Sequence, residues 1–158
     1  MPGRLSPYII IAGFLGAAIV PTPASGQSGE GERSRAKAEI QLVLTAQQAA
    51  WNRGEIEEFM KGYWNSPNTV FVSGDDVTRG WQTVYDRYRS KYSNREKMGT
   101  LQFSELEIQP LNDDAALVLG RWALDRAADK PHGRFTLIFK RTADGWKIVH
   151  DHTSAASP

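Results

Sequence analysis

Two histidines near the end of the chain are the residues whose type and spacing could do chemistry. His150 and His152 stand two residues apart in a segment, 145–154, that has the composition of a β-strand entered through an Asp-Gly turn. Because side chains alternate faces along a strand, both imidazoles are predicted to share the face of Trp146 and Ile148. One of them could act as a general base or a hydrogen-bond donor, since imidazole titrates near neutral pH. The alternative is that both histidines cap the strand end or contact a dimer partner.

Metal binding at this histidine pair is a third and weaker alternative, testable by metal analysis, and no cofactor is predicted. Two imidazoles need a third ligand and oriented partners, and His132, the third histidine of the chain, lies in a predicted turn. Asp151 points away from both histidines if the strand is regular, which favours a surface or interface salt bridge for its carboxylate. A β-bulge at the strand end could reverse that orientation.

Arg121 is the second candidate, because it lies among leucine and alanine residues on one face of the predicted strand 115–125. A guanidinium in apolar surroundings is costly unless it meets a carboxylate or reaches water. It could bind a ligand carboxylate through two parallel hydrogen bonds. The alternative partners are carboxylates on neighbouring strands, namely Glu105, Glu107 and Asp151.

Three amphipathic helices must supply the other wall of any cavity. Apolar residues at helical spacing predict helices over residues 34–53, from 56 towards 67, and over 80–92. Most of their aromatic side chains are expected in the core, while Tyr63 and Tyr88 are the preferred donors of a hydroxyl to a ligand. The aromatic residues predicted to line the helix side are Trp51, Tyr63, Trp64, Trp81, Tyr88 and Tyr92. The charged residues assigned to the solvated face of the third helix are Arg87, Arg89 and Lys91.

The second half of the chain is rich in strands. A short strand at 69–72 is followed, after the third helix, by strands over 100–110, 115–125 and 133–141 and by the final segment. The apolar residues change parity near Ser104-Glu105, which predicts a β-bulge that bends the sheet. The fold class is therefore α+β, a cone-shaped fold in which three N-terminal helices pack on a strongly curved antiparallel sheet. The open mouth of such a cone is where a small ligand would bind.

The N-terminal region has the layout of a secretory signal peptide. Residues 1–26 combine a basic start, an apolar run that is short for a membrane span, and a small-residue end, so cleavage after Gly26 is predicted. The alternative is an uncleaved N-terminal anchor. Residues 27–33 are then a flexible lead-in, 34–154 a single domain and 155–158 a tail. The predicted location is periplasmic or secreted, and the absence of cysteine means that an exported domain must rely on its core.

The charge balance limits the classes of partner. Without Arg4, the 19 basic side chains of the full chain become equal in number to its 18 acidic ones. A neutral chain argues against nucleic-acid binding and against an anionic membrane surface after signal cleavage. The sequence also has no Ser-His-Asp pattern, phosphate-binding loop or dinucleotide fingerprint.

Three stretches carry a resemblance to a known superfamily. They are Ala50-Trp51-Asn52-Arg53-Gly54, Gly80-Trp81, and the run from Asp144 to Ser154. Together with the order of elements, they resemble the nuclear transport factor 2-like superfamily, and within it the SnoaL-like branch, which is similar to the association domain of calcium/calmodulin-dependent kinase II. The resemblance implies a curved-sheet cone, a pocket at its wide end, and a homodimer formed through the outer face of the sheet. It does not imply one activity, because relatives include enzymes and non-catalytic domains.

The sequence thus predicts an exported, homodimeric domain that binds a small, partly apolar organic molecule, which can be neutral or anionic. If the domain is an enzyme, the expected chemistry is cofactor-free proton transfer of the isomerase, dehydratase or cyclase kind. His150 or His152 would then be the base, and Arg121 or a tyrosine would stabilise the developing negative charge. The alternative is a non-catalytic dimerisation or ligand-binding module.

Overall fold

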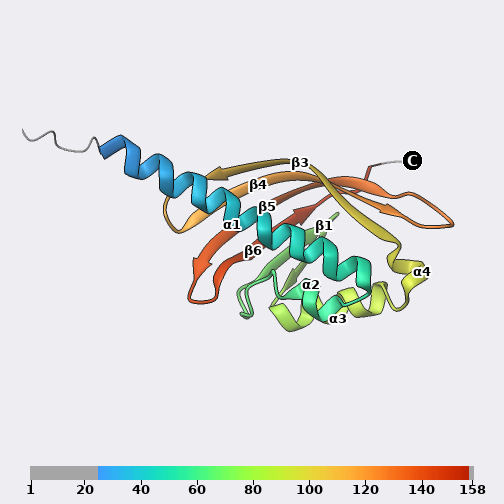
Figure 1. The fold of residues 1–158 in the computed structure, drawn as a ribbon. Coiled ribbons are helices and arrows are strands. Elements are labelled where there is room, and N and C mark those ends of the chain that lie inside the picture. The colour runs from blue at the N-terminus through green and yellow to red at the C-terminus, as the bar shows by residue number, and fades with distance from the viewer. Residues whose placement is uncertain (1–24, 157–158) are drawn as a thin grey trace, which may run out of the picture.

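A curved six-stranded sheet forms one layer of the fold, and the helices cover its concave face (Figure 1). The structure is a computed structural model that describes residues 25–156. The predicted α+β cone is therefore confirmed. The elements are α1 (Ser25–Arg53), α2 (Ile56–Met60), β1 (Val70–Ser73), β2 (Asp76–Arg79), α3 (Trp81–Lys91), α4 (Arg95–Met98), β3 (Thr100–Pro110), β4 (Ala115–Asp125), β5 (His132–Thr142) and β6 (Gly145–Thr153).

The strand order is β2-β1-β6-β5-β4-β3, and all neighbours are antiparallel except β1 and β6. The long strands lie where the sequence predicted them. Strand β2 was not predicted from the sequence: residues 76–79 pair back onto β1 through a tight turn at Gly74, whose φ is +61°. The bulge expected near Ser104-Glu105 is confirmed, because the β3–β4 register shifts between Ser104 and Glu107.

Helix α1 extends further towards the N-terminus than the sequence indicated. Residues 27–33, expected as a flexible lead-in, continue the helix, since extending an existing helix costs less than starting one. The predicted signal peptide lies almost entirely outside the described residues. Within residues 25–156, no helix is both long and apolar enough to span a membrane.

The core lies between α1 and the inner face of the sheet. Ile40 and Leu44 of α1 are almost fully buried, as are Val118, Phe139 and Ile148 of the strands. Each fully buried aliphatic or aromatic side chain contributes about 1.5–3 kcal/mol to stability. This packing fixes α1 diagonally across the concave face (Figure 1).

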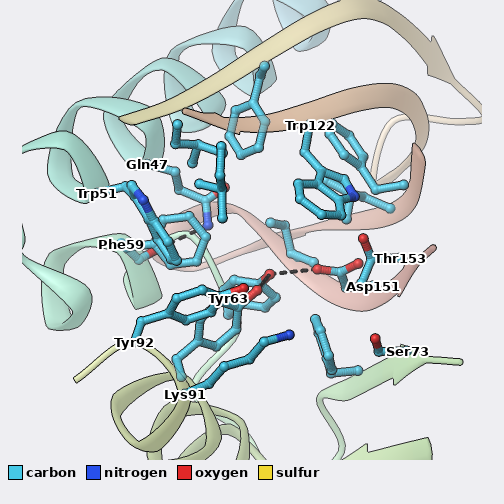
Figure 2. A pocket seen from close by; sticks show the side chains of 18 of the residues that line it. Gln47, Trp51, Phe59, Tyr63, Ser73, Lys91, Tyr92, Trp122, Asp151 and Thr153 are labelled. Atoms are coloured by element: carbon cyan, nitrogen blue, oxygen red, sulfur yellow. Dashed lines mark hydrogen bonds between the residues drawn. The ribbon is translucent and has the colours of Figure 1, made fainter. Parts of the chain in front are cut away.

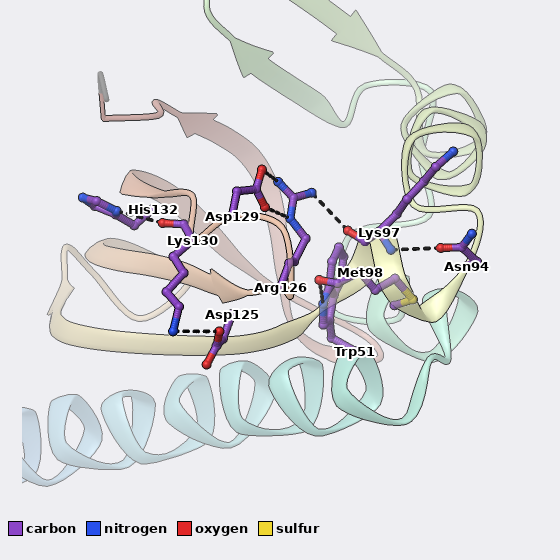
Figure 3. Close-up of polar contacts among 9 residues, drawn as sticks. All are labelled: Trp51, Asn94, Lys97, Met98, Asp125, Arg126, Asp129, Lys130 and His132. Atoms are coloured by element: carbon purple, nitrogen blue, oxygen red, sulfur yellow. Dashed lines mark hydrogen bonds and ion pairs between the residues drawn. The ribbon is translucent and has the colours of Figure 1, made fainter.

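The short helix α4, which the sequence did not predict, joins one end of the sheet to the helices. Asn94 caps it by accepting a hydrogen bond from the Lys97 backbone N–H at 2.9 Å. The Met98 carbonyl accepts one from the Trp51 indole at 3.2 Å. On the β4–β5 connection, Arg126 pairs with Asp129 and also donates to the Lys97 carbonyl at 3.2 Å (Figure 3). The end of the sheet is therefore tied to the helices.

A substitution at Gly120 in β4 tests how closely the inner face of the sheet is packed. A methyl group at this position would overlap the ring of Phe135 and stand 2.8 Å from Leu106 Cδ2. Gly120→Ala should therefore lower the free energy of unfolding by about 1–3 kcal/mol, because overpacking forces neighbouring groups to shift. Urea denaturation measures this difference.

The matched control is Gly31→Ala on α1, where nothing lies within 4 Å of the added carbon. That variant should be unchanged or more stable by up to about 1 kcal/mol, since alanine favours helix over glycine. Equal stability of the Gly120→Ala variant and the parent protein would contradict the packing described.

Candidate functional site

An aromatic cavity of about 150 Å³ lies between the helices and the inner face of the sheet (Figure 2). A cavity of this size can hold a single aromatic ring. Edge-to-face packing builds its wall, as between Trp51 and Tyr92, whose ring centroids are 4.7 Å apart. The aromatic lining residues are Trp51, Phe59, Tyr63, Phe71, Tyr88, Tyr92, Phe103, Trp122 and Phe135.

Tyr63 is held in this wall by the sheet and not by a helix. The sequence predicted that α2 would continue through Tyr63, but α2 ends at Met60. The following segment bonds to β6, because the Ile148 N–H donates to the Gly62 carbonyl and the Trp64 N–H donates to the Ile148 carbonyl, both at 2.9 Å. This two-sided attachment fixes the direction of the Tyr63 ring.

A β-bulge in β6 brings Asp151 into the cavity. Ile138 pairs with His150 while Phe139 pairs with Ile148, so Val149 is an extra residue that reverses the alternation of faces. Ile148 and Asp151 consequently both line the cavity. The expectation that both histidines share the face of Ile148 is corrected by this bulge.

Asp151 is almost completely buried and only half satisfied. Its Oδ2 accepts a hydrogen bond of 2.6 Å from the Tyr63 hydroxyl, as the dashed line in Figure 2 shows. Its Oδ1 has no partner among the residues described. The Tyr88 hydroxyl lies 3.4 Å from that of Tyr63, which is long for a hydrogen bond between hydroxyls. One carboxylate oxygen and one hydroxyl are thus available to a ligand.

The surroundings set the protonation state of all three groups near neutral pH. Burial raises the pKa of Asp151 from 3.8 to about 7, and the hydrogen bond from Tyr63 partly opposes this rise. Burial, together with the nearby Asp151 charge, raises the pKa of Tyr63 and of Tyr88 well above 10. The carboxyl can therefore exchange a proton at neutral pH, while both tyrosines remain hydrogen-bond donors.

The structure brings some of the predicted ligand-binding residues to the cavity and leaves others away from it. Trp51, Tyr63 and Tyr88 line it, as does Tyr92. Trp64 is not among the lining residues. Trp81 also lies outside the cavity. It donates its indole N–H to the Met60 carbonyl at 3.0 Å and stacks on Tyr85.

Arg121 faces the outside of the sheet, because it alternates along β4 with the inward Gly120 and Trp122.

His150 and His152 lie on the outer face of the sheet, opposite Asp151. His152 is exposed and His150 is half-buried. Burial lowers the pKa of His150 from 6.5, and the neighbouring charges of His152 and Arg79 add to the effect. Neither histidine lines the cavity. The described residues also contain no cluster of three or more histidine or acidic side chains able to hold a metal ion.

Two basic residues of α3 were assigned to solvent, yet they line the cavity. Arg87 and Lys91 are among its lining residues. The sequence does hold a signal for this placement, because they follow the fully buried Val84 by three and seven residues and so share its helical stripe. Asp151 has no comparable signal, because its orientation depends on the bulge.

The chain belongs to the SnoaL-like domain family of the nuclear transport factor 2-like superfamily, because residues 40–158 match that family. No curated protein matches the chain. The similarity to solved structures agrees with this family assignment.

A nuclear transport factor 2-like protein of unknown function from Shewanella oneidensis is 37% identical, covers 75% of this chain and 98% of its own, and superposes with a TM-score of 0.72. A nuclear transport factor 2-like superfamily protein from Salmonella enterica is 20% identical over 79% of this chain and 94% of its own, with a TM-score of 0.64. A ketosteroid isomerase-like protein from Erwinia carotovora is 20% identical over 77% and 96%, with a TM-score of 0.61. The last two share the fold.

The burial of Asp151 has a measurable effect on stability. The folded protein keeps this proton up to a pKa of about 7, whereas the unfolded chain releases it near 3.8. The folded state therefore binds more protons between these values, and the contribution of Asp151 to the free energy of unfolding falls as pH rises from about 4 to 7. Asp151→Asn removes this term and should be more stable than the parent at pH 8, by as much as roughly 4 kcal/mol.

Urea unfolding at pH 5 and pH 8 checks this prediction. Asp144→Asn, in the exposed turn before β6, makes the same chemical change without burial and should follow the parent at both pH values. If the stability difference between Asp151→Asn and the parent were the same at pH 5 and pH 8, the raised pKa would be refuted.

Proposed function

We propose that this protein is a cofactor-free enzyme that moves a proton between carbon atoms of a ring-sized carbonyl compound, with Asp151 as the base. The observation that carries the proposal is a buried carboxyl, with one oxygen free of hydrogen bonds, in the wall of an aromatic cavity. Its pKa of about 7 leaves a large fraction of the base ready at neutral pH. A purely structural carboxylate would be expected to satisfy both oxygens.

The proposed reaction is the isomerisation of a β,γ-unsaturated ketone to its α,β-unsaturated isomer. Asp151 removes a proton from the carbon between the carbonyl and the alkene, and the electron pair of that C–H bond forms a dienolate. Asp151 then returns the proton to the γ-carbon, so the double bond moves and no proton is gained or lost. Both steps need a base whose pKa is near the working pH.

A tyrosine hydroxyl is the proposed donor to the dienolate oxygen. Tyr88 is the better placed of the pair, because its hydroxyl makes only the long 3.4 Å contact with Tyr63, whose own proton is committed to Asp151. A preorganised donor in a site that excludes water stabilises a developing oxyanion by about 2.7–4 kcal/mol. Tyr63 acts as a positioning residue, since it orients the carboxyl.

Cyclohex-3-enone is a suitable test substrate, because its conversion to the conjugated cyclohex-2-enone is followed by ultraviolet absorbance. We expect kcat/KM to rise with pH through about 7 as Asp151 loses its proton. Asp151→Asn should lower kcat by about 10²–10⁴-fold. Tyr63→Phe removes the hydrogen bond that opposes the rise in the pKa of Asp151, so its pH profile should move to higher pH.

The matched controls carry the same chemical changes outside the cavity. Asp144→Asn lies in an exposed turn, and Tyr85→Phe alters a ring that stacks on Trp81. Both should retain parental kinetics. Turnover that survives in Asp151→Asn but is lost in His150→Gln would favour the histidine base instead. Tight binding of the ketone without turnover would favour the non-catalytic binding module.

We also propose that the protein is exported and forms a homodimer through the outer face of its sheet. Leu119 of β4 is 36% exposed on that face, between the buried Val118 and Gly120. Leu119→Lys should therefore convert a dimer into a monomer, as measured by size exclusion with light scattering. Leu42→Lys on α1, where the leucine is 68% exposed, is the control and should leave the dimer intact. A monomeric parent protein would contradict this interface.

A further inference from the structure

Two cations stand in the wall of the aromatic cavity. Arg87 and Lys91 are one helical turn apart on α3, so their side chains project from the same stripe of that helix. Lys91 is an exposed residue, and its side chain extends along the cavity below Tyr63 in the view of Figure 2. Arg87 is half-buried, with its guanidinium 5.5 Å from the centre of the Phe71 ring. This side of the opening is therefore positively charged.

These charges are not neutralised by the protein around them. Lys91 forms no ion pair with any residue in the described part of the chain, and burial followed by repulsion from Arg87 and Arg126 lowers its pKa. Arg87 has one loose ion pair, 3.6 Å from the carboxylate of Asp76, which is 75% exposed. Exposed pairs of this kind contribute about 0–1 kcal/mol. Arg126 differs, because Asp129 binds it through two hydrogen bonds.

The single acidic residue that lines the cavity, within the residues described, is Asp151 on the opposite wall. Its ionised form would repel a second anion placed beside it. A ligand that carries one negative charge would therefore lie with that charge towards α3 and with its apolar part among the aromatic rings.

We infer that the substrate is a ring-sized carbonyl compound that also carries a carboxylate, and that Arg87 and Lys91 bind this carboxylate at the mouth of the cavity. This inference rests on the proposed function of Asp151, because it assigns the substrate class of the same site. Arginine and lysine suit the task, since a guanidinium can bind a carboxylate through two parallel hydrogen bonds and an ammonium adds a point charge. The carboxylate would hold the reacting carbon on the Asp151 side. This arrangement replaces Arg121, which faces outward, as the anion receptor.

A pair of ligands of nearly equal shape tests the inference without any need for turnover. The probes are 3-phenylpropanoate and its neutral amide, 3-phenylpropanamide, titrated by tryptophan fluorescence at pH 8 in 20 mM and in 300 mM NaCl. We expect the acid to bind about tenfold more tightly than the amide at low salt. The preference should shrink at high salt, because the site is open to solvent. The Arg87→Gln/Lys91→Gln double variant should lose the preference while its Kd for the amide is unchanged.

Arg89→Gln is the matched control, because Arg89 lies on the same helix but contacts Tyr85, which is outside the cavity lining. It should keep the full preference for the acid. Equal Kd values for acid and amide in the parent protein, or a preference that survives in the double variant, would overturn the inference. Retention of the preference in a protein whose turnover is unchanged by Asp151→Asn would uphold the anion site and refute the proposed catalysis alone.

Discussion

The hydrogen bond between Tyr63 and Asp151 depends on one extra residue in β6. Val149 has no place in the regular register with β5, and the resulting bulge turns Asp151 inward and both neighbouring histidines outward. The same strand holds the backbone on either side of Tyr63, because Ile148 bonds to Gly62 and to Trp64. Donor and acceptor are thus positioned by one strand, so the 2.6 Å contact needs no loop to order it.

The sequence was sufficient for most of the fold because its patterns are local. Helical spacing over α3 and the parity change at Ser104-Glu105 each reflect which face of an element is buried, and both were read correctly. The bulge at Val149 leaves no such trace, because the segment from Trp146 to His152 fits a regular strand equally well. The sequence therefore favoured a surface or interface position for Asp151 and left the histidines open between the cavity and a strand-end or dimer contact. A one-residue difference in register decides between these placements.

Arg87 and Lys91 illustrate a different kind of error. Charged residues on an amphipathic helix are usually solvated, so Arg87 and Lys91 were predicted on the solvent face although they share the stripe of Val84. The structure accommodates them because a cavity and its opening lie where a core would otherwise be. Long basic side chains can run along apolar walls while their charged ends reach water, which makes them compatible with both environments.

The cavity keeps its charges apart, and this separation explains how one small site could bind an anion and still hold a base of neutral pKa. Burial and Tyr63 set the pKa of Asp151, and neither Arg87 nor Lys91 lowers it. A cation in contact with Asp151 would hold the carboxylate ionised at low pH and weaken it as a base. The unpaired Oδ1 instead lowers the free energy of unfolding at neutral pH, because the buried group must lose its proton there without a compensating partner. A hydrogen-bond donor on a ligand in the cavity would supply the missing contact.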